Sequence, residues 1–105
     1  MANLTLMAQN GLATVGTGFN IGTAVTTVNL QFTPQASAGF SGQVVIDGSA
    51  APSPGASDWF PIATLNFTAH TTLLDFNLYF TNNPWIRARL PANATLGAVS
   101  IYLAY

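Results

Sequence analysis

The sequence predicts an all-β fold: a single-domain antiparallel β-sandwich or jelly-roll-like barrel of about eight strands. Hydrophobic residues recur at every second position in several segments, which is the period of a half-buried strand. Clusters of Pro, Gly, Asn and Ser separate these segments, and no segment has the period of an amphipathic helix. Many short strands divided by turn residues are typical of sandwiches and barrels.

Four segments carry the alternation most clearly: 25–32, 40–46, 74–80 and 97–105. In each, one face is apolar and the other carries mostly polar or small residues, so we expect the apolar face to line the core. The residues expected to point inward are Val28, Leu30, Phe32, Phe40, Val44, Ile46, Leu74, Phe76, Leu78, Phe80, Val99, Ile101, Leu103 and Tyr105.

Shorter strands are predicted at 3–8, 12–16, 59–68 and 85–90, with turns between them. The longest loop is predicted to begin at Asp47-Gly48 and to run through the Pro- and Gly-containing residues 49–58. No change in composition divides the chain, so residues 1–105 are expected to form one domain. An extended arm over residues 1–20 is an alternative for the N-terminal region, and the Gly-rich segment 16–23 is expected to be an arm or a loop.

Charged residues make up only 5% of the chain, against about 25% in an ordinary soluble domain. There is no Lys, Glu or Cys, and the formal net charge is −1. Nucleic-acid binding and attraction to anionic membranes both need clustered basic residues, so neither kind of partner is expected. With so little charge, the protein needs either a surface rich in Thr, Asn, Ser and Gln or partner subunits that cover its surface. The sequence shows the first feature and also suits the second.

Catalytic residues are not expected. The single histidine, His70, would need an orienting partner such as Asp75 and a serine nucleophile, and no nucleophile motif surrounds any serine. One His and scattered Asp residues give no ligand spacing for a metal, and no cofactor motif is present. Calcium held by Asp47 or Asp58 with loop carbonyls is an unsupported alternative. We therefore expect a protein that is not an enzyme.

The only two cations lie beside a tryptophan. On the strand predicted at 85–90, Trp85, Arg87 and Arg89 share one face, and Ile86, Ala88 and Leu90 share the other. Two interpretations stay open. In one, the arginines stack on an aromatic ring and pair across the sheet with Asp75 or Asp47; in the other, they contact another subunit. The candidate interface residues are Trp85, Arg87, Arg89, Tyr79 and Asp75.

From Phe40 onward the order of features resembles small β-sandwich virion proteins of tailed bacteriophages, the group that includes capsid decoration or cement proteins and head–tail accessory subunits. The resemblance is carried by Asp47-Gly48-Ser49, by Trp59 in the segment SDWFPIATL, by Ile86-Arg87-Ala88 and by Val99-Ser100-Ile101. It covers about the C-terminal two-thirds of the chain, and residues 1–40 have no counterpart in it.

The resemblance implies a homo-oligomer, with a trimer favoured, that is made in the host cytoplasm and binds the major capsid protein or other virion proteins on the capsid surface. Two alternatives remain. One is a head–tail connector or tail subunit, which shares the fold and differs in copy number. The other is a carbohydrate-binding or host-recognition module, for which Trp59, Trp85, Tyr79 and Tyr102 are candidate aromatic contacts.

Overall fold

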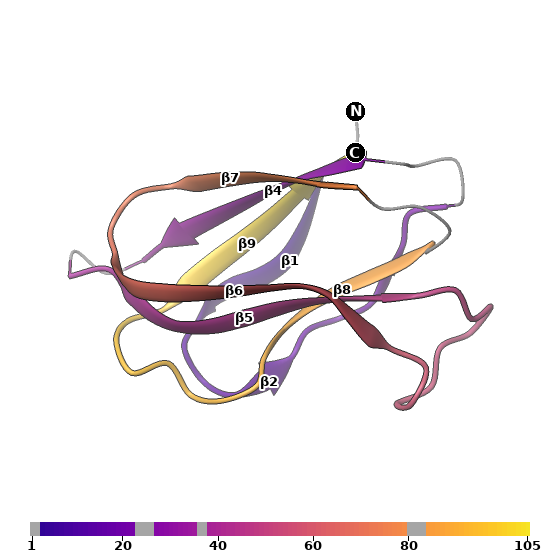
Figure 1. Ribbon diagram of the computed structural model, residues 1–105, viewed down its shortest axis with the longest axis horizontal. Coiled ribbons are helices and arrows are strands. Elements are labelled where there is room, and N and C mark those ends of the chain that lie inside the picture. The colour runs from indigo at the N-terminus through magenta and orange to yellow at the C-terminus, as the bar shows by residue number, and fades with distance from the viewer. Residues whose placement is uncertain (1–2, 23–26, 36–37, 80–83) are drawn as a thin grey trace.

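The structure, a computed structural model, describes residues 3–22, 27–35, 38–79 and 84–105. These residues form two packed antiparallel sheets and contain no helix, which confirms the all-β prediction (Figure 1). The nine strands are β1 (Asn3–Asn10), β2 (Thr14–Val15), β3 (Phe19–Asn20), β4 (Thr27–Pro34), β5 (Phe40–Ser49), β6 (Phe60–His70), β7 (Leu74–Tyr79), β8 (Trp85–Leu90) and β9 (Val99–Ala104).

The first sheet has the order β1-β9-β4-β7 and the second has the order β2-β8-β5-β6, with β3 also paired to β8. Because β2 and β3 both pair with β8, they act as two pieces of one interrupted edge strand. With these two counted as one, eight strands form two four-stranded sheets, and the chain passes from one sheet to the other at most connections. This arrangement is that of a double-sheet jelly roll.

The core lies between the two sheets and is built by the alternating residues. Inward-facing residues of β4, β5, β8 and β9 are at most 2% exposed, so these strands are confirmed with their predicted faces. Leu74, Phe76, Leu78 and Tyr105 pack against the core but are only half-buried, and Phe80 lies outside the described residues. The buried apolar residues on the predicted inward faces of these four strands are Val28, Leu30, Phe32, Phe40, Val44, Ile46, Ile86, Ala88, Leu90, Val99, Ile101 and Leu103.

Two details differ from the sequence prediction. Residues 3–20, for which an extended arm was an alternative, contribute β1, β2 and β3 to the two sheets. The prediction that Asp47-Gly48 begins the long loop is wrong, because β5 continues to Ser49 and Asp47, Gly48 and Ser49 pair with Arg87, Ile86 and Trp85. The loop therefore spans residues 50–59, and the acidic-Gly-Ser segment belongs to the interior of a sheet.

Two glycines with positive φ provide a matched test of backbone packing. A Cβ added at Gly39 (φ 93°) would lie 2.7 Å from the backbone oxygen of His70, whereas one at Gly22 (φ 86°) would meet no described atom within 4 Å. Replacing either glycine by alanine places an L-residue in the left-handed region. Only Gly39→Ala also requires the backbone at residues 69–70 to move away from the new Cβ. We expect Gly22→Ala to lower the free energy of unfolding by about 1 kcal/mol and Gly39→Ala by about 2 kcal/mol. Urea denaturation measures both, and equal losses would contradict this packing.

Candidate functional site

A buried carboxylate lies between the two arginines on the outer face of the second sheet. Asp47 on β5 is 1% exposed, and one of its oxygens, Oδ2, accepts hydrogen bonds from Arg87 Nε at 3.0 Å and from Arg89 Nε at 2.7 Å. The register places Arg87 directly opposite Asp47, and Arg89 opposite Val45, two residues away on the same face. The interpretation in which the arginines pair across the sheet is confirmed, with Asp47 and not Asp75 as their partner.

Trp59, the last residue of the 50–59 loop, covers this cluster. Its ring centre lies 4.4 Å from the guanidinium carbon of Arg87, which is a cation–π contact. Gly18 leaves space for the indole, because a Cβ at this position would lie 2.8 Å from Trp59 Cη2. We call Asp47, Arg87, Arg89 and Trp59 the arginine clasp. Asp47 belongs to β5, the two arginines belong to β8, and Trp59 belongs to the 50–59 loop. The arginine clasp therefore connects these three segments.

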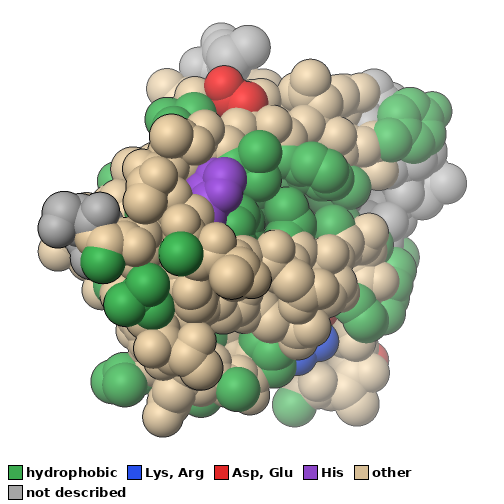
Figure 2. All heavy atoms as spheres, turned by 60° about the vertical axis from the view of Figure 1, so that its left-hand side comes forward, with side chains coloured by type: hydrophobic (Ala, Val, Ile, Leu, Met, Phe, Trp, Pro, Cys, Tyr) green, Lys and Arg blue, Asp and Glu red, His purple; other side chains and the backbone are tan. Residues whose placement is uncertain are grey.

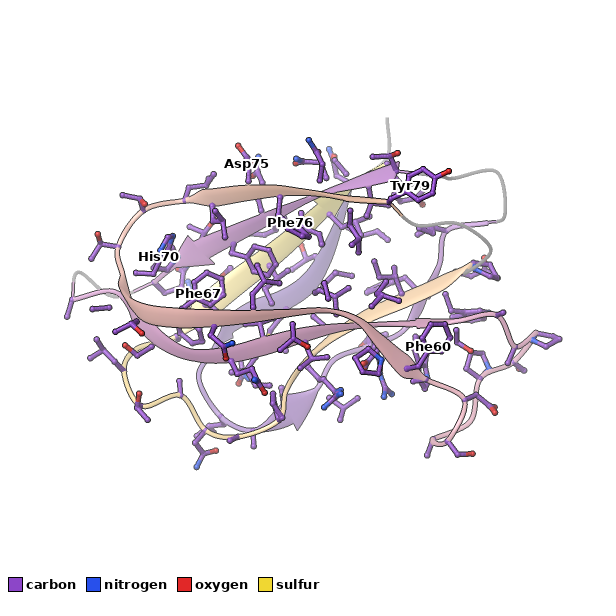
Figure 3. All side chains as sticks on the ribbon, viewed as in Figure 1. Phe60, Phe67, His70, Asp75, Phe76 and Tyr79 are labelled. Carbon is purple, nitrogen blue, oxygen red and sulfur yellow. The ribbon has the colours of Figure 1, made fainter. Side chains whose placement is uncertain are left out.

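The five candidate interface residues do not form one surface. Trp85, Arg87 and Arg89 lie on β8 in the second sheet, whereas Asp75 and Tyr79 lie on β7, at the edge of the first sheet. Tyr79 is 76% exposed and Asp75 is exposed, and both stand on the upper strand of Figure 3. Trp85 is half-buried, and its Nε1 has no hydrogen-bond partner among the described residues.

The sandwich is open on the side where β6 and β7 lie. Within the described part of the chain, β6 is hydrogen-bonded to β5 alone and β7 to β4 alone, so each is the edge of its sheet. Phe67 and Phe76 point from these strands into the space between them, and Phe67 lies next to His70 (Figure 3). Figure 2 shows hydrophobic side chains gathered beside the histidine on this face. We call the inward-facing residues of the two edges the open side: Leu65, Phe67, Leu74, Phe76 and Leu78.

A hollow occupies the outer face of the first sheet, on the side turned away from the core. It encloses about 430 Å³ and is lined by uncharged residues, with Tyr102 as its aromatic member. Tyr102 is 40% exposed, whereas Ile101 and Leu103 on either side of it are buried in the core. The lining residues are Asn3, Leu4, Thr5, Asn29, Gln31, Tyr102, Leu103 and Ala104. Tyr102 is recognisable in the sequence as a candidate aromatic contact, but the hollow is not, because it depends on how β1, β9 and β4 are aligned.

The titratable groups lie apart from one another outside the arginine clasp. His70 ends β6, its ring packs edge-on against Phe67 with centroids 5.2 Å apart, and its Nε2 has no partner among the described residues. Asp58 Oδ2 accepts a hydrogen bond from the backbone N–H of Gly55, which closes a turn in the 50–59 loop. In the ranges that the structure describes, no three His, Cys, Asp or Glu residues come close enough to hold a metal ion, and no helix is long and apolar enough to cross a membrane.

Comparisons with known proteins give no relative: the chain matches no protein-family model, no curated protein and no solved structure. The features that bear on function are therefore the fold, the arginine clasp, the open side and the hollow.

Proposed function

We propose that this chain is a structural virion protein, a decoration or cement subunit that binds the outer surface of a capsid and stabilises it. The observation that carries the proposal is a surface with almost no charge. Three of the five charged residues form ion pairs with one another in the arginine clasp. The other two, Asp58 and Asp75, are exposed. A free domain normally carries many more charges on its surface to remain soluble.

The open side supports assembly of the chain with further copies of itself. The residues of the open side are half-buried, apart from the buried Phe67, and they adjoin two strand edges that have no partner strand among the described residues. β6 also has no charged residue that would block pairing. From Ala63 to Phe67 the β6 ladder is regular, without a bulge or a proline. An uncharged edge does not repel an identical edge, so a second copy is the occupant that we assign to this side. The resemblance to phage virion proteins favours a trimer.

The jelly roll agrees with this proposal, since viral capsid subunits are among the proteins that use it. The same architecture occurs in lectins and in cupin enzymes, so the fold alone does not select a function. The selection comes from the nearly uncharged surface, together with the sequence resemblance carried by Trp59 and Ile86-Arg87-Ala88.

The test is made on particles of the virus that encodes the chain. We expect hundreds of copies per particle by quantitative mass spectrometry, co-sedimentation of the purified chain with heads that lack it, and restored heat resistance of those heads after its addition. Heads that are equally heat-resistant without the chain and do not bind it would overturn the proposal. A copy number of about a dozen or fewer would instead assign the chain to the head–tail connector or the tail.

A further inference from the structure

The outer face of the first sheet carries two rows of polar side chains that the strand register sets side by side. In the first row, Thr5 lies opposite Tyr102, Tyr102 opposite Gln31, and Gln31 opposite Asp75. Neighbouring strands are about 4.8 Å apart, so side chains on neighbouring strands of one row are in reach of one small ligand.

The second row runs parallel to the first, two residues further along each strand. It consists of Asn3, Ala104, Asn29 and Asn77. Asn29 Nδ2 donates to Asn77 Oδ1 at 3.1 Å, which fixes the orientation of both amides. Ala104 is the small member of this row and lies two residues from Tyr102 on β9, so it leaves the space that forms the floor of the hollow.

We propose that this hollow binds a neutral saccharide. Its volume of about 430 Å³ is within the range of small-molecule sites, about 300–1,000 Å³. Amide and hydroxyl side chains both donate and accept hydrogen bonds, which matches the hydroxyl groups of a sugar. The face of the Tyr102 ring carries partial negative charge and therefore attracts the C–H groups on the flat side of a pyranose.

The chemistry of the lining argues against other classes of ligand. None of the described residues that line the hollow is charged, so an ionic ligand gains no partner from them. Asp75 lies outside the hollow, at the end of the first row, and its negative charge disfavours anions nearby. A purely apolar ligand would cover the amides of Asn3 and Gln31 without offering them hydrogen bonds, which is costly.

A second protein subunit also fits this face poorly. The fully buried centre of a protein interface is more apolar than the rest of the protein surface, whereas amide and hydroxyl side chains line much of this hollow. Here the apolar residues are on the open side, at the β6 and β7 edges, while the hollow faces outward from β1, β9 and β4. The saccharide site is therefore independent of the assembly that we propose for the open side.

The experiment uses the full chain, labelled with ¹⁵N and titrated with maltose, cellobiose, lactose and N,N′-diacetylchitobiose, together with an array of neutral and sialylated glycans. We expect at least one of these neutral sugars to bind with a dissociation constant of about 0.1–10 mM, with shift changes concentrated in residues 3–5, 29–31 and 102–104. Sialylated glycans are expected to bind no better than their neutral counterparts.

Three variants test the site itself. Tyr102→Ala and Ala104→Leu are each expected to weaken binding by about tenfold or more, the first by removing the stacking face and the second by filling the hollow. Tyr102→Phe keeps the ring and is expected to stay within about threefold of the wild type. Tyr79→Ala removes an exposed tyrosine outside the hollow and is the matched control, expected to bind as the wild type does.

The proposal is overturned if no sugar in the titrations or on the array binds the wild type, if binding survives both Tyr102→Ala and Ala104→Leu, or if sialylated glycans are preferred. Thermal denaturation of each variant checks that it is folded. Because Tyr102→Ala leaves the open side unchanged, binding to capsid heads is expected to be unaffected, so failure of the saccharide site and failure of the virion function are distinguishable.

Discussion

Asp47→Asn is expected to lower the free energy of unfolding by about 3 kcal/mol, a large loss for a substitution that replaces a carboxylate by an amide of nearly the same shape. The asparagine side chain keeps the shape of Asp47 but removes the negative charge that Arg87 and Arg89 share through Oδ2. The two guanidinium groups, whose side chains are 15% and 28% exposed, would then lie together without a counter-charge. Removing one partner of a buried ion pair costs about 3–5 kcal/mol, and the partial exposure of the arginines places the expected value at the lower end.

Urea denaturation measures the loss in free energy of unfolding. Thermal denaturation is expected to show a fall in Tm of about 15 °C for a domain of this size. Asp75→Asn is the matched control, since it makes the same change on an exposed strand position and is expected to stay within about 0.5 kcal/mol of the wild type. In the double variant Asp47→Asn/Arg89→Gln the loss is expected to be smaller than the sum of the single losses, because the two residues share one interaction. If Asp47→Asn is as stable as the Asp75→Asn control, the arginine clasp does not stabilise the fold.

The position of Asp47 in β5 could not be predicted from local sequence patterns. Asp-Gly is a common turn signal, and a proline-rich segment follows it, so residues 47–48 were predicted to leave the sheet. In the structure, Asp47 is held in β5 by two arginines about 40 residues later in the chain. The alternation of Arg87 and Arg89 on one strand face was visible in the sequence, and it was compatible both with pairing across the sheet to Asp75 or Asp47 and with contact to another subunit. Only the pairing of β5 with β8 identifies that partner as Asp47.

The strands themselves were predictable because their signal is local. In β4 and β9, apolar residues alternate with less apolar ones, and burial of one face follows from that alternation alone. The apolar residues are Val28, Leu30 and Phe32 in β4, and Val99, Ile101 and Leu103 in β9. The hollow was not predictable in the same way. Its residues are separated by most of the chain length, and it exists because β9 pairs with both β1 and β4. A register shift of one residue would turn Tyr102 into the core.

Leu73→Lys is expected to weaken self-association of the chain by about tenfold or more. Leu73 lies in the connection between β6 and β7, beside the open side, and is 50% exposed, so the substitution removes no core contact and the variant should fold normally. A lysine there introduces a positive charge next to an apolar surface and is the residue that natural proteins use to prevent pairing of sheet edges. Sedimentation-equilibrium measurements over a range of protein concentrations give the change in the dissociation constant.

Leu12→Lys is the matched control, because Leu12 is also an exposed leucine, 67% exposed, but lies between β1 and β2, away from the β6 and β7 edges. If the oligomer forms through the open side, Leu73→Lys shifts the equilibrium toward monomer and Leu12→Lys does not. Equal weakening by both would mean that solubility and not a defined contact governs association. Weakening by Leu12→Lys alone would place the contact at the β1–β2 end. The open side is the contact between copies only if Leu73→Lys is the variant that weakens their association. Leu12 is also an exposed apolar residue, but it does not adjoin the β6 and β7 edges.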